Sequence, residues 1–314
     1  MEEYNSAQLF NPTNGCVITI GTFDGVHIGH RAILEQVVAV AKAEGLTSVL
    51  LPFFPHPRMV LQNDSSIKMI NTLEEKKHLL NAIGVDHMVV HPFTREFSRM
   101  TAMEYVRDIL VEQLHAKKVI IGYDHRFGRN RDANIDDLRE FGEVYGFDVI
   151  EIGAQQLDEV SVSSTKIRKA LKSGDIDTAN RYLGYCFSLS GTVVPGHGRG
   201  RKMDYPTANL KVDKPYKLVP AHGVYLTRSS IEGKSIYGLT SIGTNPTFEG
   251  EQQTIETYFL DLDQDLYEQQ LTLEFMAFLR GEQRFESAQE LIKAIEGDEA
   301  MARKIIQQYD SMAL

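Results

Sequence analysis

The stretch CVITIGTFDGVHIGHRAILEQVVAVAKAEG, residues 16–45, contains three kinds of pattern in succession. Residues 16–20 are short, apolar and rich in β-branched side chains, which predicts a buried strand. Residues 30–45 repeat apolar side chains at helical spacing, which predicts a helix. The turn between them, residues 21–30, therefore follows the carboxyl end of a strand, where open parallel sheets bind their ligands.

The same alternation of strands and helices continues outward from this stretch to about residue 185. Two helices carry capping-box patterns, Thr72 with Glu75 and Thr101 with Glu104. Apolar strands that alternate with helices predict a parallel sheet covered on both faces. The expected strands are 48–53, 87–90, 117–122 and 147–152, and the expected helices are 72–84, 101–114 and 135–146.

After about residue 186 the pattern changes to short strands separated by Gly, Pro, Asp and Asn. This pattern predicts a small antiparallel barrel or sandwich with a helical tail of two segments, 287–298 and 299–310. We therefore expect two domains, 1–185 and 186–314. The expected strands are 187–194, 223–230, 234–243, 254–262 and 271–279.

Composition narrows the functional classes. The formal net charge of −10 argues against broad contact with a nucleic-acid backbone, although residues 125–131 and 197–202 form two short basic clusters. The two cysteines show no ligand spacing and indicate a reducing compartment. The sequence shows neither a long apolar stretch nor a signal-peptide pattern, so we expect a cytoplasmic protein with no membrane partner.

Three interpretations fit the two histidines of GTFDGVHIGH, His27 and His30. A zinc site would need a third protein ligand, and no cysteine pair or HExxH pattern accompanies them. They are alternatively two structural histidines. The third interpretation is a phosphate site, in which Gly25 and Gly29 allow close backbone approach and the helix N-terminus faces an anion. We favour the phosphate site.

A second segment, SVSSTKIRKAL at 161–171, supports the phosphate interpretation. Three hydroxyl residues precede or begin a predicted helix, and Lys166 and Arg168 lie in its first turn. Cationic residues are unfavourable at a helix N-terminus by a few tenths of a kcal/mol, unless an anion is bound there. A nucleotide triphosphate would offset that cost.

The two segments together resemble the nucleotidylyltransferase superfamily, with its HxGH and ST-x-I-R signatures. FFPHPR (53–58) and GYDHRFGRNR (122–131) are similar to the flavin-side segments of the prokaryotic FAD synthetase module. The resemblance implies catalytic roles for His27 and His30 and a flavin site at Phe54, Asp124 and Phe127. It implies that ATP is bound by Gly21, Phe23, Asp24, Gly25, His27, Gly29, His30, Ser164, Thr165 and Arg168.

A different phosphate chemistry is indicated by GTVVPGHGRGRKMDYPTANL, residues 191–210. Its glycines lie between strands with no helix after them, so a Rossmann fingerprint is excluded by context. A glycine-rich hairpin without a ligand remains the alternative to a phosphate-covering loop. Thr207 and Asn209 offer hard oxygen ligands suited to Mg²⁺ on one side of an extended segment.

With GTNPTFEG (243–250) and Glu256 downstream, this region resembles riboflavin kinase. The resemblance implies that Glu256 is the general base and that Thr207 and Asn209 hold Mg²⁺. It implies that the kinase ATP is bound by Gly196, Gly198, Arg199, Gly200, Thr207 and Asn209.

The two resemblances cover nearly the whole chain, which is thus similar to the bifunctional riboflavin kinase/FAD synthetase family. The family implies an α/β nucleotidyltransferase domain with a Rossmann-like parallel sheet (1–185), which adenylylates FMN to FAD. It implies a six-stranded antiparallel β-barrel domain with C-terminal helices (186–314), which phosphorylates riboflavin to FMN. ATP, riboflavin and FMN are then the small-molecule partners, FAD is the product, and the oligomeric state is left open.

The chain departs from the family pattern at three places. Ser161 stands where many relatives have Arg, Asp204 stands where relatives usually have Gly, and a common Gly is missing from the 129–134 loop. Two rival functions also remain: a nucleotidyltransferase for another acceptor, such as a phosphocholine, pantetheine or nicotinate nucleotide, and a flavin-binding sensor without catalysis.

Overall fold

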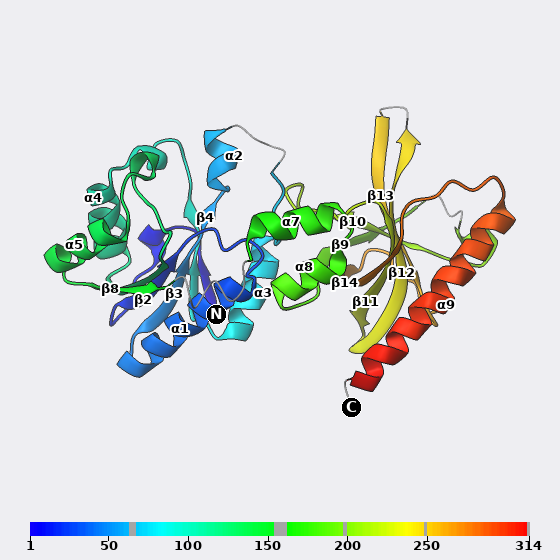
Figure 1. Ribbon diagram of the computed structural model, residues 1–314, viewed down its shortest axis with the longest axis horizontal. Helices are drawn as coiled ribbons and strands as arrows, with labels where there is room; N and C mark the ends of the chain where they lie inside the picture. Colours follow the sequence, from blue (N-terminus) through cyan, green and yellow to red (C-terminus); the bar gives the residue numbers. More distant parts are fainter. Residues whose placement is uncertain (63–66, 154–161, 197–199, 248–249, 313–314) are drawn as a thin grey trace. The chain divides into compact units, whose positions relative to one another are not determined.

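The computed structural model describes residues 1–62, 67–153, 162–196, 200–247 and 250–312. The chain divides into two compact units, an N-terminal unit of residues 1–164 and a barrel unit of residues 165–314. The two units meet at 164/165, whereas the sequence analysis expected the boundary at 185/186. The difference is a stretch with two helices, which packs with the second unit. Figure 1 shows the elements of each unit.

A six-stranded, fully parallel sheet forms the centre of the N-terminal unit, as the alternating pattern predicted. Its strand order is β1-β5-β3-β2-β7-β8, so β2 lies in the interior of the sheet and all five of its residues are buried. The first strand, β1, escaped the sequence prediction because it is only three residues long. The strands are β1 Glu2–Tyr4, β2 Cys16–Ile20, β3 Thr47–Leu51, β5 His87–Val89, β7 Ala116–Gly122 and β8 Asp148–Ile152.

Helices cover both faces of this sheet, and each face has its own hydrophobic cluster. Residues of α1 and α3 pack with Val17 and Leu50 on one face, while residues of η3 and α5 pack with Ile18 on the other. The helices are α1 Ile28–Glu44, α2 Pro57–Leu61, α3 Leu73–Ile83, α4 Ala102–Glu104, the π-helical η3 Tyr105–Gln113 and α5 Ile135–Tyr145. Three short 3₁₀ turns are η1 Ala7–Leu9, η2 Phe97–Arg99 and η4 Arg129–Arg131, and two short strands, β4 Phe53–Phe54 and β6 His91–Pro92, pair beside the main sheet.

The local signals for helix ends are confirmed. Thr72 with Glu75 and Thr101 with Glu104 each form a complete capping box at the start of α3 and α4. Gly84 ends α3 in a left-handed conformation with φ 94°. Such caps satisfy backbone groups that a helix terminus otherwise leaves without partners.

Two helices, α7 Ser164–Lys172 and α8 Ile176–Leu183, precede the barrel and pack on it. The Asn180 side chain donates to the Phe275 carbonyl at 2.8 Å and accepts the Phe187 N–H at 2.7 Å. The Leu171 carbonyl of α7 accepts a further bond from the Ala221 N–H at 3.0 Å. These bonds explain why residues 165–185 belong to the compact unit of the barrel.

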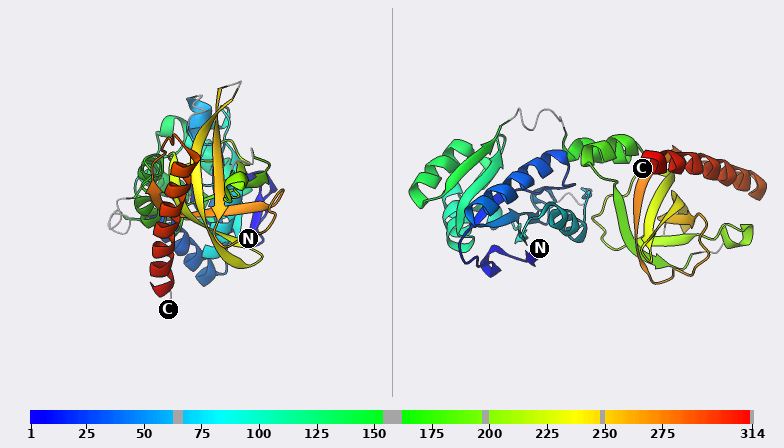
Figure 2. Two further views of the ribbon diagram at one scale, coloured as in Figure 1. Left: turned by 90° about the vertical axis from the view of Figure 1, so that its right-hand side faces the viewer. Right: turned by 90° about the horizontal axis from the view of Figure 1, so that it is seen from below.

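The barrel itself is closed and antiparallel, in the order β10-β13-β12-β11-β14-β9 (Figure 2). Closure pairs every strand on both sides and leaves no open sheet edge among these six strands. The sequence prediction of an antiparallel barrel is thus confirmed. The strands are β9 Ser188–Val194, β10 Ala208–Val212, β11 Gly223–Ile231, β12 Lys234–Thr247, β13 Gly250–Phe259 and β14 Gln270–Arg280, and a short 3₁₀ turn, η5 Gly200–Met203, precedes β10.

The helical tail is a single helix, α9 Ala288–Met312, so the expectation of two segments was wrong. The expected break at 298/299 lies inside this helix, and so does Gly297. The next residue, Asp298, is buried and accepts three hydrogen bonds of 2.9–3.0 Å from the Arg280 guanidinium. This ion pair and the packing of Ala302 on the barrel outweigh the helix cost of one glycine, about 1 kcal/mol.

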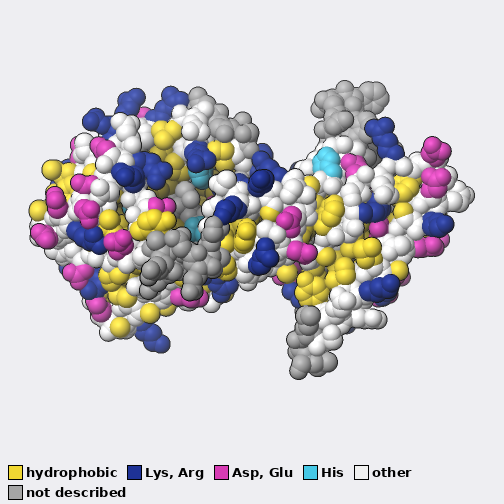
Figure 3. Space-filling model, viewed as in Figure 1, with side chains coloured by type: hydrophobic (Ala, Val, Ile, Leu, Met, Phe, Trp, Pro, Cys, Tyr) yellow, Lys and Arg dark blue, Asp and Glu magenta, His cyan; other side chains and the backbone are white. Residues whose placement is uncertain are grey.

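The surface carries both signs of charge. On the face seen in Figure 3, Lys and Arg side chains are interspersed with Asp and Glu side chains over both units. Within the described ranges, none of the helices has the length and apolarity needed to cross a membrane.

Candidate active sites in the two units

The turn between β2 and α1 has a strained backbone. Gly21 and Gly25 have φ values of 153° and 88°, and two non-glycine residues, Phe23 and Val26, have φ values of 43° and 35°. A left-handed φ costs a non-glycine residue about 1–2 kcal/mol. The turn therefore needs support from the surrounding structure, since it holds this shape at a cost.

Asp24 supplies part of that support from inside the protein. Its side chain is fully buried, and its carboxylate accepts the Ile70 N–H at 2.9 and 3.2 Å and the Asn71 N–H at 3.3 Å. The backbone carbonyl of Asp24 accepts a hydrogen bond of 2.8 Å from Ser164 Oγ. Asp24 was expected to bind ATP, and the structure gives it a role in holding the turn to its surroundings.

The Ser164 bond joins the two sequence motifs that suggested a nucleotide site. Ser164 is the first residue of α7, as the hydroxyl-rich segment predicted, and it contacts a residue 140 positions earlier in the chain. Thr165 and Arg168 follow in the same helix but fall in the barrel unit. Their assignment to the phosphate site stays a prediction.

His27 and His30 form a stacked pair at the start of α1. Their ring centroids lie 3.6 Å apart with an interplanar angle of 16°, and the Phe23 ring lies 4.6 Å from His30. A metal ion lies near the plane of each imidazole that ligates it. Two nearly parallel planes 3.6 Å apart have no such point in common, so this arrangement does not fit one metal ion shared by both rings.

The hydrogen bonding of His27 decides which of its ring nitrogens can donate. His27 is the N-cap residue of α1, and its Nδ1 accepts the His30 N–H at 3.3 Å. A neutral ring that accepts at Nδ1 carries its proton on Nε2. His27 Nε2 can therefore donate to a ligand. His30 Nδ1 is buried and has no hydrogen-bond partner within the part of the chain that the structure describes.

Burial keeps both rings neutral at physiological pH. It lowers the pKa of His27 to about 4, and the charge of Asp24 offsets this only in part. Burial, with smaller effects from His27 and Lys76, lowers the pKa of His30 well below its ordinary value. The histidines thus offer hydrogen-bond donors without a full positive charge.

Sequence reasoning missed Lys76, a residue of α3 that bonds to the backbone of this turn. Lys76 is only 3% exposed, and its Nζ donates to the Thr22 carbonyl at 2.6 Å. Burial lowers its pKa to about 8, against a raising effect from Asp24. One signal was present in the sequence: Leu73, Lys76, Leu80 and Ile83 have the spacing of an apolar helix face, which a lysine interrupts.

The glycines of the turn differ in whether the fold requires glycine at their positions. Gly25 needs its left-handed φ of 88°. A Cβ on Gly29 would lie 3.4 Å from the His27 ring, an ordinary contact, so the fold alone does not require glycine there. The expected role of Gly29 in close approach to a phosphate stays a prediction.

The three expected flavin residues occupy different environments. Phe127 is buried in the cluster of one sheet face, with the Tyr105 ring 6.0 Å away, whereas Phe54 packs on the cluster of the other face. Asp124 is exposed, two residues after the carboxyl end of β7. The structure therefore does not stack Phe54 and Phe127 together.

Sequence reasoning also missed Tyr105 and the group of aromatic rings that connects it to β4. The Tyr105 hydroxyl is buried and has no hydrogen-bond partner among the described residues, and burial raises its pKa. Ring centroids 4.8–6.5 Å apart link Phe53, His91, Phe93, Phe97, Tyr105 and Phe127.

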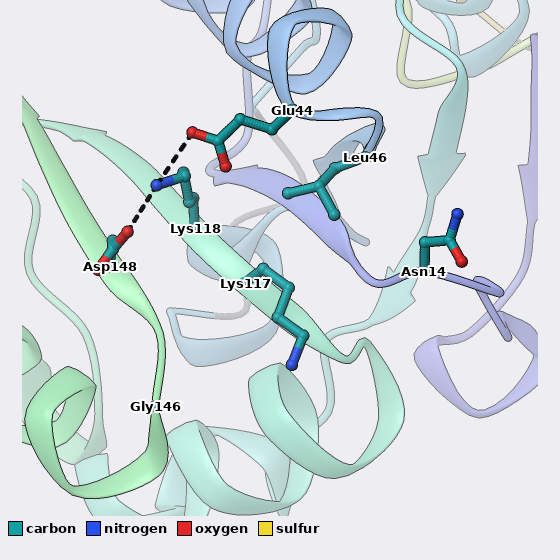
Figure 4. A pocket seen from close by; sticks show the side chains of 7 residues that line it. All are labelled: Asn14, Glu44, Leu46, Lys117, Lys118, Gly146 and Asp148. Carbon is teal, nitrogen blue, oxygen red and sulfur yellow. Dashed lines mark hydrogen bonds and ion pairs between the residues drawn. The ribbon is translucent and has the colours of Figure 1, made fainter.

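A surface pocket lies at the opposite end of the strands from the turn, near the amino ends of β7 and β8 (Figure 4). Lys117 and Lys118 near the start of β7 and Asp148 at the start of β8 line it, with Asn14, Glu44, Leu46 and Gly146. The Lys118 ammonium already bonds Asp148 at 2.5 Å and Glu44 at 3.1 Å. Because parallel sheets bind ligands at the carboxyl ends of their strands, the turn and not this pocket is the candidate active site.

In the barrel unit, strand pairing brings the predicted kinase residues together. Asn209 on β10 lies opposite Glu256 on β13, so their side chains share one face of the sheet, and Thr207 precedes Asn209 by two residues. Thr207 Oγ1 donates to Glu256 Oε2 at 3.2 Å. All three residues are half-buried.

Gly196 and Gly200 lie very close to the segment that contains Thr207 and Asn209. A Cβ on Gly196 would lie 2.2 Å from Asn209 Nδ2, and one on Gly200 would lie 2.2 Å from the Tyr205 carbonyl oxygen. Real Cβ atoms essentially never come this close, so a side chain at either position would have to displace its neighbour. Gly198 and Arg199, also expected to bind ATP, lie outside the described residues.

The departures from the family pattern coincide with unusual backbone. Asp204 has φ 63°, and Asn130 and Arg131 in the 129–134 loop have φ 60° and 59°. Non-glycine residues thus adopt left-handed conformations at both places where the family resemblance led us to expect glycine. Ser161 lies outside the described residues.

Comparison with known proteins gives a match for each unit. Residues 10–166 match the family described as FAD synthetase, and residues 183–306 match the family described as riboflavin kinase. Bifunctional riboflavin kinase/FMN adenylyltransferases from Listeria monocytogenes and Escherichia coli K12 are each 36% identical to this chain. The Listeria alignment covers 91% of both chains, and the Escherichia alignment covers 93% of both.

A solved structure matches over the same length. A crystal structure described as that of a macrolide-efflux protein from Streptococcus pneumoniae has a TM-score of 0.87 and 27% identity to this chain. The match covers 96% of this chain and 98% of that one.

Proposed function

The chain belongs to the family of bifunctional riboflavin kinase/FMN adenylyltransferases, and from that premise we propose how its own residues carry the two reactions. Its N-terminal part is an FAD synthetase domain, and its C-terminal part is a riboflavin kinase domain. ATP is the co-substrate, and riboflavin, FMN and FAD are the flavin substrates and products. The residue roles, the metal ion, the functional boundary and the location are the proposal.

In the kinase step, the riboflavin 5′-hydroxyl attacks the γ-phosphorus of ATP and ADP leaves. Glu256 orients this hydroxyl and accepts its proton as the general base. The loop that contains Gly196, Gly198, Arg199 and Gly200 covers the phosphates. The contact between Thr207 Oγ1 and Glu256 Oε2 carries this assignment, because it joins the two segments that the family motif requires.

The oxygen atoms at this site are suited to Mg²⁺. Thr207 gives its hydroxyl hydrogen to Glu256, so the lone pairs of Oγ1 remain available for a cation. Asn209 adds an amide oxygen on the same face. Thr207 and Asn209 would hold the ion, and when bound it would neutralise charge on the transferring phosphates.

In the adenylylation step, a phosphate oxygen of FMN attacks the α-phosphorus of ATP. The bond from the α-phosphorus to its bridging oxygen breaks, and pyrophosphate leaves. The nucleophile is already an anion, so the protein needs to supply orientation and charge stabilisation instead of a strong base. His27 donates from Nε2, and His30, Thr165 and Arg168 help stabilise the charge that grows on the leaving group.

The turn 21–30 holds the triphosphate in this proposal. Gly21, Phe23, Asp24, Gly25 and Gly29 shape the backbone, and α1 directs its N-terminal N–H groups and the positive end of its dipole at the phosphates. The hydrogen bond between Ser164 and Asp24 carries the assignment, since it ties the second motif directly to the turn. Phe54, Asp124 and Phe127 face the flavin, and the ring of Tyr105 beside Phe127 supports an aromatic environment there.

We place the functional boundary at 185/186, with adenylylation in residues 1–185 and phosphorylation in residues 186–314. We also propose a cytoplasmic location. Two free thiols, Cys16 and Cys186, support it because a reducing compartment keeps cysteines unpaired.

A time course tests the whole proposal. The pure chain is incubated with riboflavin, ATP and Mg²⁺, and the flavins are separated by chromatography. We expect FMN first and FAD after it, and we expect EDTA to stop both steps. FMN alone would give the N-terminal unit another acceptor. Flavin that stays bound without turnover would make the chain a binding protein.

A further inference from the structure

Lys76 is a buried cation on the face of α3 that packs into the core. Leu73, Leu79 and Ile83 from the same helix pack on the cluster that contains Leu80, while Lys76 is 3% exposed. Burial of an ammonium group is expensive unless it is paired and hydrogen-bonded. An apolar side chain of similar length would satisfy the packing, so the charge requires another explanation.

The ammonium of Lys76 reaches the strained turn between β2 and α1. Nζ donates to the Thr22 carbonyl at 2.6 Å, immediately before Phe23, whose φ is 43°. The carboxylate of Asp24 holds the other side of the same turn through the Ile70 N–H. The strained residue Phe23 thus lies between two residues that are each held by a hydrogen bond, Thr22 through its carbonyl and Asp24 through its carboxylate.

The charged and titratable groups that act on Lys76 also belong to this site. Asp24 favours its charged form, and the charge of Lys76 in turn lowers the pKa of the His30 ring. His27 is the next titratable group, with a pKa of about 4. Between pH 6 and 9, Lys76 is thus the group of this set whose charge changes, because burial places its pKa at about 8.

We propose that Lys76 is a positioning residue of the adenylyltransferase site, whose ammonium holds the Thr22 carbonyl and thereby the shape in which the turn presents His27 to the triphosphate. This inference rests on the proposed role of the turn. It assigns Lys76 no contact with ATP or flavin. The effect of Lys76 on the reaction therefore passes through the backbone of residues 22–27.

Lys76→Met tests the proposal in the full-length chain. The methionine fills the same space without charge or donor. We expect kcat for FAD formation from supplied FMN to fall at least tenfold, with a smaller change in KM for ATP. Riboflavin phosphorylation by the same preparation should stay within twofold, because it uses the barrel unit. Unchanged FAD formation would overturn the proposal.

Lys77→Met is the matched control. Lys77 is the neighbouring residue, its side chain is 41% exposed, and it pairs only with Glu3 at the surface among the contacts described. Both activities should stay within twofold in this variant. A loss of FAD formation equal to that of Lys76→Met would overturn the proposal, because it would assign the effect to α3 in general.

The pH profile separates positioning by a charge from packing alone and does not depend on the folding of a variant. In the wild-type chain, kcat/KM for FAD formation should fall as pH rises through about 8, where Lys76 loses its proton. The kinase reaction, measured over the same range, provides the reference. A wild-type profile that stays flat relative to this reference from pH 7 to 9 would overturn the proposal. Absence of wild-type FAD formation at every pH would instead reject the proposed function.

Discussion

The two proposed phosphate sites are built from different kinds of structure. At the turn of the N-terminal unit, the polar groups are buried: Asp24 is 0% exposed, Lys76 is 3% and His27 is 6%. At the barrel, Thr207, Asn209 and Glu256 are half-buried and lie on paired strands. The first site is held by hydrogen bonds to a strained backbone, and the second by strand register.

The two sites therefore differ in what determines the state of their functional groups. Burial determines the protonation of the histidine pair, so the donors at the turn are set by the environment of the fold. Strand pairing determines which side chains of the barrel meet, because opposite residues of antiparallel strands share one face. Substitutions at the turn should therefore change activity by altering the local backbone geometry. Substitutions at the barrel site should change activity by removing single side-chain groups.

The largest expected effect comes from Glu256→Gln. Glutamine keeps the size of the side chain and still accepts from Thr207, but it cannot take up a proton. FMN formation should fall by about 10²–10⁴-fold, the usual contribution of a general base. FAD formation from supplied FMN should stay unchanged, measured by chromatography of the flavins.

Glu274→Gln is the control for this variant, since Glu274 pairs with Arg228 on another strand pair of the same barrel. Its FMN formation should stay within twofold. A Glu256→Gln chain that loses both activities would contradict two independent sites.

The reverse effect is expected from His27→Asn. Asparagine remains a good N-cap for α1, while the Nε2 donor is lost. FAD formation should fall by about 10²–10³-fold, the range for removal of one donor at a reacting phosphate or oxyanion. FMN formation should continue.

The exposed His78, on α3, supplies the matched control as His78→Asn, with both activities retained. If His27→Asn formed FAD at the wild-type rate, the histidine pair would be structural and the phosphate site would have to be sought elsewhere.

Stability should depend on pH through His27. Its pKa is about 4 in the fold and 6.5 as the ordinary value, so the unfolded chain binds a proton more readily below pH 6.5. Stability is thus retained above pH 6.5 and lost as pH falls toward 4, by about 3 kcal/mol in total. Thermal unfolding at pH 7 and at pH 4.5 should show a smaller loss in His27→Asn than in the wild-type chain. Equal losses would show that the ring is not buried in its neutral form.

The smallest effect is expected far from both sites, from Gly297→Ala in α9. A Cβ at this position meets no atom within 4 Å, so alanine should stabilise the helix by about 0.5–1 kcal/mol. Both activities should be unchanged. Gly45→Ala is the contrast, because Gly45 also has open space but a left-handed φ of 66°, and alanine there should destabilise the chain. Equal effects of the two substitutions on the unfolding temperature would contradict this reasoning.

Motif residues and element types could be predicted from the sequence where the signal is local. The capping boxes of Thr72 and Thr101, the buried strand before the turn and the change of period near residue 186 all depend on residues a few positions apart. Lys76 was missed because a lysine in a helical pattern is usually exposed. Its burial is seen only in the folded chain, where it bonds to Thr22 in the turn 21–30. The tail helix was expected as two segments, 287–298 and 299–310, because the ion pair between Arg280 and Asp298 cannot be seen in the local pattern.

The sequence by itself determined the parallel α/β unit, the antiparallel barrel and the two phosphate motifs, because periodicity and short motifs report local backbone preferences. The tertiary structure alone decided that Ser164 bonds Asp24, that Lys76 lies below Thr22, and that residues 165–185 pack with the barrel. These contacts join residues far apart in the chain, and they form only when the folded core brings their elements together. Burial at those contacts then sets the charge of His27, which no spacing of residues can specify.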